Sequence, residues 1–178
     1  MRYAVLASLA LFAGPASAHP SHVSGFVHPF VGADHLLAMV AVGLWAAQLG
    51  GRWRWALPLA FVSAMALGGL AGFVGFALPG LEPMLAASVL VLGLLVALRV
   101  QWRAGGAGLA AAFAVFHGMA HAAELPAGAG PAGYAAGFIA ATALLHTVGV
   151  ALGLAPRARF AGVPIALAGA WLLAGAVS

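Results

Sequence analysis

The most regular feature of this chain is the alternation of long apolar segments with short breaks rich in glycine and proline. An α-helix needs about 20 predominantly apolar residues to cross the roughly 30 Å hydrocarbon core of a bilayer. Segments near this length lie at 28–49, 55–78, 82–100, 106–124, 133–154 and 160–177. The sequence therefore predicts an all-α fold, a polytopic transmembrane bundle whose six spans form one domain over residues 19–178.

A further apolar stretch at the start of the chain is typical of a signal peptide. Arg2 precedes a short apolar run at 4–14, and Ala16-Ser17-Ala18 resembles an A-x-A cleavage site. We expect cleavage after Ala18, which removes residues 1–18 and leaves His19 outside the cytoplasm. The alternative is an uncleaved first helix, but this run is short for a membrane span.

Composition strengthens the membrane interpretation and excludes several other classes. Hydrophobic residues make up 65% of the chain and charged residues only 6%, whereas soluble domains are about 25% charged. The arginines are scattered between apolar runs rather than clustered, which argues against nucleic acid as a partner. The chain has no phosphate-binding GxxxxGK[ST] loop, so we expect no nucleotide partner. It also has no cysteine, which excludes thiolate ligands and cysteine nucleophiles.

The arginines also predict how the spans are oriented. Pairs of arginines follow the first, third and fifth spans: Arg52 and Arg54, Arg99 and Arg103, and Arg157 and Arg159. Short loops with arginine stay cytoplasmic, so all three pairs favour one topology in a bacterial inner membrane. Both ends of the mature chain are then periplasmic. Three tryptophans beside these arginines fit an interfacial aromatic belt: Trp53, Trp55 and Trp102.

Polar side chains within the spans are few and regularly spaced. Ionisable groups at membrane depth are costly and usually face a cavity or one another. They fall in three spans: His28, Asp34 and His35 in the first, His117, His121 and Glu124 in the fourth, and His146 in the fifth. Residues three or four apart share one face of a helix, so the three residues of the fourth span form a single row. Asp34 can bind a metal directly or orient a neighbouring imidazole.

The expected topology turns these residues into a descending series. At about 1.5 Å per residue, His28, His121 and Glu124 lie near the periplasmic mouth. Asp34, His35 and His117 lie about 10 Å deeper, and His146 lies about 20 Å below the outer face. Such a series predicts a path for a cation. Met39, Thr142, His19 and His22 are auxiliary candidates, although Met39 also fits simple packing.

The chemistry of the side chains narrows the kind of metal. Imidazole nitrogens and carboxylates suit borderline divalent metals such as nickel, cobalt, zinc or copper(II), and are poor ligands for calcium or magnesium. We therefore expect a divalent metal ion and the lipid bilayer as partners, with the metal bound or transported rather than used as a catalytic cofactor. A homo-oligomer is compatible with the sequence.

The motifs resemble those of the HupE/UreJ family of small bacterial membrane proteins. The matching stretches are His28-Pro29 with Gly32, Asp34-His35 and Met39, then Phe116-His117-Gly118 with His121 and Glu124, and Thr142 with Leu145-His146. Ala122 departs from the family, which often has glycine there. The resemblance implies nickel uptake that serves hydrogenase or urease maturation, with cobalt carried by some relatives. It implies a permease and not an enzyme.

Three other interpretations compete with metal uptake. An intramembrane zinc hydrolase also combines several histidines with an aspartate, but it needs one closed site with an open coordination position. A haem protein would use paired axial histidines. A purely structural subunit is disfavoured by the cost of burying so many ionisable groups in a bilayer.

Overall fold

The computed structural model describes residues 24–178, and within that range every regular element is a helix. The elements in chain order are α2 (His28–Val31), α3 (Ala33–Leu49), α4 (Trp53–Phe73), α5 (Leu81–Ala97), α6 (Arg103–Ala123), α7 (Pro131–Gly153), the 3-10 turn η2 (Ala158–Ala161) and α8 (Gly162–Ala176). The proposed signal peptide, His19 and His22 lie outside the described residues. The predicted all-α bundle of apolar helices is confirmed.

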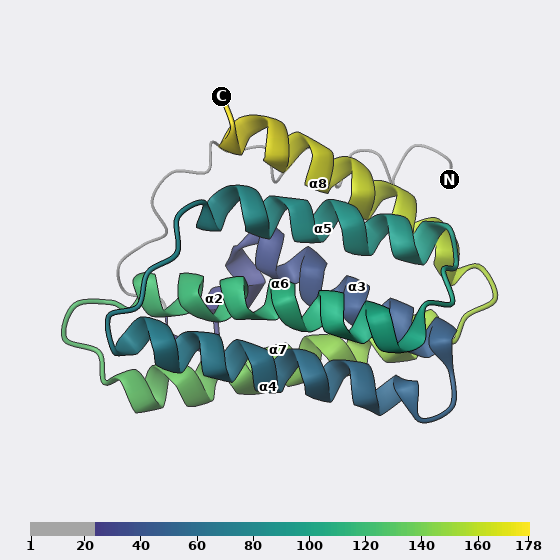
Figure 1. Cartoon of the computed structure of the whole chain (residues 1–178). Helices are drawn as coiled ribbons and strands as arrows, with labels where there is room; N and C mark the ends of the chain where they lie inside the picture. The colour runs from purple at the N-terminus through teal and green to yellow at the C-terminus, as the bar shows by residue number, and fades with distance from the viewer. Residues whose placement is uncertain (1–23) are drawn as a thin grey trace.

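The long helices run side by side along one common axis (Figure 1). The most extensive packing is between α4 and α6, between α5 and α8, and between α3 and α7. Helix α3 also contacts α4, α5, α6 and α8 and therefore lies at the centre. Its side chains Met39 and Trp45, together with Phe61 of α4, are fully buried in the apolar core.

Helix lengths agree in part with the predicted spans. Four helical segments are long and apolar enough to cross a membrane, at Trp53–Phe73, Arg103–Ala123, Pro131–Gly153 and Ala158–Ala176, whereas Ala33–Leu49 and Leu81–Ala97 are shorter apolar helices. The second predicted span, 55–78, differs at its end because α4 stops at Phe73 and Gly75 then adopts a φ of 93°. The number of crossings stays a prediction.

The first predicted span is divided by a break at Gly32. Residues His28–Val31 form α2, Gly32 has the extended values φ −80° and ψ 112°, and α3 begins at Ala33. On an unbroken helix, residues seven apart are separated by about 10 Å along the axis. Here the ring centroids of His28 and His35 are 5.5 Å apart. The break therefore brings together two histidines that the sequence pattern places at different depths.

Charged residues separate to opposite ends of the bundle. The loops that carry the arginine pairs join α3 to α4, α5 to α6 and α7 to η2, and all three lie at one end (Figure 1). Glu82 and Glu124 lie in or beside the loops at the other end. We call these the arginine end and the acidic end. Their separation is what the positive-inside rule requires, and the assignment of each end to a membrane side stays a prediction.

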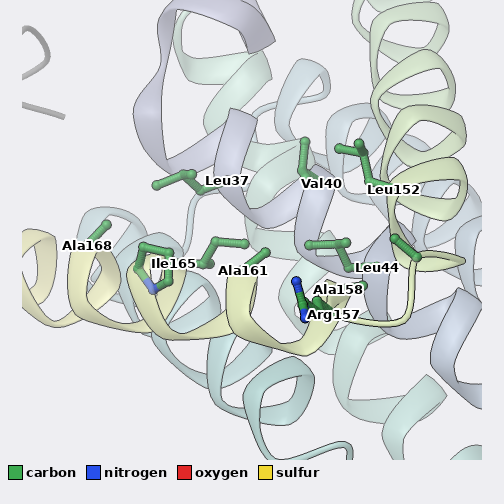
Figure 2. A pocket seen from close by; sticks show the side chains of 11 residues that line it. Leu37, Val40, Leu44, Leu152, Arg157, Ala158, Ala161, Ile165 and Ala168 are labelled. Atoms are coloured by element: carbon green, nitrogen blue, oxygen red, sulfur yellow. The ribbon is translucent and has the colours of Figure 1, made fainter. Parts of the chain in front are cut away.

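An apolar groove on the outside of the bundle is separate from the histidines. It has a volume of about 550 Å³ and lies between α3, α7 and α8, with Arg157 at its margin (Figure 2). Leu37, Val40 and Leu44 line it from α3. On a helix of 3.6 residues per turn, Leu37 and Val40, two and five positions beyond His35, point to the side of α3 opposite His35. The groove that they line therefore offers no polar path to the histidine side chains.

Close backbone contact between α4 and α6 depends on glycine. A Cβ atom added at Gly118 would overlap the carbonyl oxygen of Met65 and the backbone nitrogen of Gly69, whereas one added at Gly108 of the same helix meets nothing within 4 Å. Small residues let helices approach closely in membranes. Gly118→Ala should therefore force the two helices apart.

We expect Gly118→Ala to destabilise the protein by about 1–3 kcal/mol, the usual cost of overpacking. The measurement is thermal unfolding of the detergent-purified protein followed by circular dichroism. Gly108→Ala is the matched control and should leave the midpoint unchanged or slightly higher, because alanine favours the helix. Equal midpoints for the two variants would contradict the close packing at Gly118.

Candidate metal centre

Four side chains from separate helical segments converge at the acidic end of the bundle. His28 comes from α2, His35 from α3, and His121 and Glu124 from the end of α6. One ligand atom from each lies within 4.8 Å of the other three. Two ligands of one transition-metal ion, each about 2.1 Å from it, are at most about 4.2 Å apart. Small side-chain movements would therefore bring all four onto a single ion. We call these four residues the histidine–carboxylate cluster.

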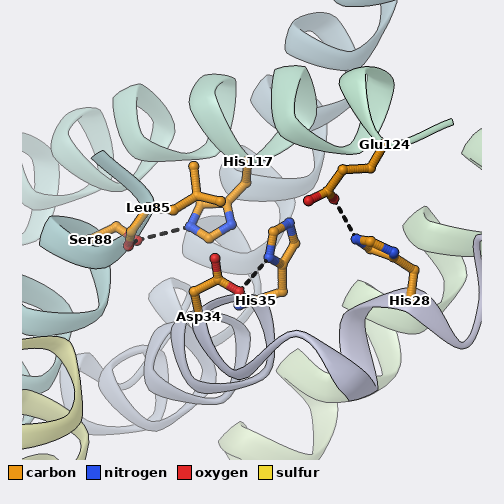
Figure 3. Close-up of polar contacts among 7 residues, drawn as sticks. All are labelled: His28, Asp34, His35, Leu85, Ser88, His117 and Glu124. Atoms are coloured by element: carbon orange, nitrogen blue, oxygen red, sulfur yellow. Dashed lines mark hydrogen bonds and ion pairs between the residues drawn. The ribbon is translucent and has the colours of Figure 1, made fainter. Parts of the chain in front are cut away.

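The cluster combines buried imidazoles with a partly accessible carboxylate. The ring centroid of His121 lies 5.0 Å from that of His28 and 4.4 Å from that of His35. Nε2 of His28 lies 2.6 Å from Oε2 of Glu124, and the side chain of Glu124 is 33% exposed (Figure 3). The cluster thus reaches the surface through Glu124, at the end of the protein that carries the acidic residues.

Asp34 orients the imidazole of His35. Nδ1 of His35 lies 2.9 Å from Oδ1 of Asp34, and the same oxygen accepts the backbone N–H of His35 at 2.8 Å. An ionised carboxylate only accepts hydrogen bonds, so the proton of His35 is on Nδ1. Its Nε2 then carries a lone pair, and this buried atom has no hydrogen-bond partner among residues 24–178. Carboxylates hold metal-binding histidines in this way in many proteins.

His121 is held by packing rather than by hydrogen bonds. Its ring is fully buried and stacks on Phe138 of α7 at 4.4 Å with an interplanar angle of 6°. Neither ring nitrogen has a hydrogen-bond partner within the part of the chain that the structure describes. Buried polar atoms without partners are costly, so the donor chemistry fits a cation held at this ring.

His117 lies next to the cluster but outside it. Its fully buried ring is 4.9 Å from that of His35. Nε2 of His117 lies 2.8 Å from the hydroxyl oxygen of Ser88 on α5, a residue that the sequence pattern did not single out. Figure 3 shows His117 between Ser88 and His35.

His146 shares an aromatic neighbour, Phe61, with His117. The centroid of Phe61 lies 5.8 Å from that of His117 and 5.2 Å from that of His146. Both nitrogens of the buried His146 ring are without hydrogen-bond partners among the described residues. The structure thus places His146 against Phe61, outside the histidine–carboxylate cluster.

Met39 and Thr142, the two auxiliary candidates among the described residues, have mainly packing contacts. Met39 is fully buried in the apolar core. The hydroxyl of Thr142 donates to the sulfur of Met65 at 3.6 Å. Neither residue belongs to the histidine–carboxylate cluster.

The predicted order of depth differs from the structure at His35. The sequence pattern places His35 with His117, about 10 Å below His28, whereas the structure places it within the same cluster as His28. The break at Gly32 is the reason, because it interrupts the helical spacing on which the depth was counted. Other neighbours of the site carried no sequence signal: Phe61, Ser88, Tyr134 and Phe138.

Fold and site together define a class of protein: a helical membrane protein with a buried imidazole and carboxylate centre near one end. Residues 6–177 match the model of the HupE / UreJ protein family, and the chain belongs to that family. It is 46% identical over 127 residues to Protein HupE of Rhizobium leguminosarum bv. viciae. That match covers 66% of this chain and 66% of the relative, so the chain spans about two thirds of the relative's length. No solved structure matches it.

The geometry predicts a single high-affinity metal site that depends on His121. We expect the purified protein to bind one Ni²⁺ per chain in isothermal titration calorimetry. Loss of a residue that only orients a metal ligand commonly weakens metal binding 10- to 100-fold. His121 is itself a candidate ligand, so His121→Ala should weaken the binding of Ni²⁺ by at least about 100-fold.

Thr147→Ala is the control for this measurement. Thr147 is exposed on α7, and its one hydrogen bond within residues 24–178 goes to the carbonyl of Ala143, one turn earlier in its own helix. Its replacement should leave the affinity for Ni²⁺ unchanged. Wild-type affinity in His121→Ala would show that the four side chains do not form the site.

Proposed function

We propose that the protein carries a divalent transition-metal cation, nickel in the first place, across the bacterial inner membrane from the periplasmic side. The observation that supports this proposal best is the convergence of His28, His35, His121 and Glu124 within 4.8 Å. The choice of nickel over cobalt or zinc rests on membership of the HupE/UreJ family, since imidazole and carboxylate accept all three metals.

The proposed route begins at the acidic end. A hydrated ion meets the partly exposed carboxylate of Glu124 and exchanges water for the imidazoles of the cluster. The next ligand is His117, whose ring is 4.9 Å from that of His35. The ligand after that is His146, and Phe61 packs against both of these rings. Phe61 is therefore the apolar neighbour of this step of the proposed route.

The membrane potential supplies enough free energy for inward movement. Moving one elementary charge inward across a potential of about 100 mV releases about 2.3 kcal/mol of free energy. A dication therefore releases about 4–5 kcal/mol at the same potential. The proposed orientation places the acidic end, with the cluster, on the positively charged side of the membrane. Transport would therefore need no nucleotide hydrolysis.

Uptake of radioactive Ni²⁺ by reconstituted vesicles with an interior-negative potential tests the proposal. Wild-type protein should accumulate the metal, and replacing both His117 and His121 by alanine should lower the initial rate by at least about 100-fold, because two successive ligands are lost. Thr147→Ala should retain the wild-type rate. Uptake that is indifferent to the double replacement would contradict the route. Metal that is bound but never accumulated would favour a metal-dependent hydrolase.

Uptake should also depend on external pH. Protons compete with metals for the lone pairs of imidazole, so the rate should be highest near neutral pH and fall below about pH 6. The measurement is the initial rate at fixed free Ni²⁺, with the membrane potential held constant by a potassium gradient and valinomycin. A rate that stays constant from about pH 5 to 8 would show that neutral imidazoles do not limit uptake.

A further inference from the structure

Ser88 is a buried serine in the middle of an otherwise apolar helix. It is fully buried on α5, and its side-chain oxygen has two close neighbours. The carbonyl oxygen of Leu85, one turn earlier in the same helix, lies 2.6 Å away. Nε2 of His117, on α6, lies 2.8 Å away. One hydroxyl thus links the backbone of α5 to a histidine beside the histidine–carboxylate cluster (Figure 3).

The single proton of this hydroxyl decides the direction of both hydrogen bonds. A carbonyl oxygen can only accept, so two oxygens 2.6 Å apart require the proton of Ser88 between them. If Ser88 donated to His117 instead, the lone pairs of two oxygens would face each other at that distance. The hydroxyl therefore donates to Leu85, and its oxygen accepts the N–H of His117 Nε2.

This arrangement leaves a specific atom of His117 as the electron-pair donor. In a neutral imidazole one nitrogen carries the proton and the other the lone pair. With the proton on Nε2, the lone pair is on Nδ1, which is buried and has no hydrogen-bond partner among the residues described. Nδ1 lies on the side of the ring away from Ser88, toward His35 (Figure 3).

We propose that Ser88 is a positioning residue that holds His117 in the Nε2–H tautomer, so that Nδ1 receives the metal ion when it leaves the histidine–carboxylate cluster. The opposite tautomer would direct an N–H group toward the cation. The transport part of this inference rests on the proposed function, whereas the assignment of the tautomer does not.

The tautomer can be measured directly by ¹⁵N nuclear magnetic resonance of protein labelled at histidine. The His117 signals are assigned by their loss in His117→Ala. Wild-type protein without metal should show a protonated Nε2 and an unprotonated Nδ1. Ser88→Ala should convert these signals to those of a mixture of tautomers, and Ser88→Thr, which keeps the hydroxyl, should restore them. Ser63→Ala, at an exposed position of α4, is the control and should match the wild type.

The transport measurement separates positioning from binding. Ser88 contacts no member of the histidine–carboxylate cluster through a hydrogen bond in the described structure. Ser88→Ala should therefore keep the affinity for Ni²⁺ within about twofold while lowering the maximal uptake rate by at least about tenfold, the effect expected of a residue that orients a ligand. Ser88→Thr should recover most of the rate.

Two results would overturn the inference. One is a wild-type spectrum with the proton of His117 on Nδ1, and the other is an unchanged His117 spectrum in Ser88→Ala. An absence of Ni²⁺ uptake by the wild type would instead contradict the proposed function, and the resonance experiment would still report on Ser88. If Ser88→Ala does not fold, the wild-type and Ser88→Thr spectra are enough to decide the tautomer.

Discussion

Burying an imidazole in an apolar bundle costs free energy unless its nitrogens find partners, and residues 24–178 bury five of them. A structural subunit would satisfy these atoms with hydrogen bonds inside the bundle. Among the described residues, hydrogen bonds or ion pairs hold His28, His35 and His117, whereas the ring nitrogens of His121 and His146 have no hydrogen-bond partner. A bound cation would accept those lone pairs and lower this cost, which supports the proposed metal site.

His35 and His117, the two histidines whose orientation is set by a hydrogen bond, carry their lone pairs on different ring nitrogens, which suits the transfer of an ion from one to the other. The carboxylate of Asp34 holds the proton of His35 on Nδ1, so its lone pair is on Nε2. The hydroxyl of Ser88 holds the proton of His117 on Nε2, so its lone pair is on Nδ1. Both partners lie outside the histidine–carboxylate cluster. Neighbouring rings therefore present lone pairs from different atoms, and an ion can move from one to the next while neither imidazole changes its tautomer.

Much of this organisation can be predicted from sequence patterns, because a bilayer restricts which residues a membrane-spanning chain can contain. Long apolar runs without charge predict helices, and a polar side chain within such a run predicts a functional site. Both arguments work residue by residue along one helix. They led to His28, His35, His121 and Glu124, and to the row on α6, without any knowledge of which helices are neighbours.

What sequence patterns could not supply is contact between helices. Ser88 bonds a residue 29 positions away, and serine in an apolar helix commonly bonds only its own backbone. The grouping of His28 with His35 depends on the backbone at Gly32, where a Cβ atom would lie 3.1 Å from Oδ1 of Asp34. Glycine there indicates a turn or a close approach equally well. Only the fold shows that the helix breaks and that the carboxylate lies beside the break.

The position of Phe61 bears on how ions could pass without protons following them. Its fully buried ring packs against both His117 and His146. A continuous row of imidazoles and water would also conduct protons, and the membrane potential would drive them inward along with the metal. An apolar ring offers protons no hydrogen bond, so Phe61 makes such a row less continuous where it packs against both imidazoles. In the proposed route, an ion that leaves His117 needs a new ligand to replace that imidazole, and His146, which packs against the same ring, is the candidate.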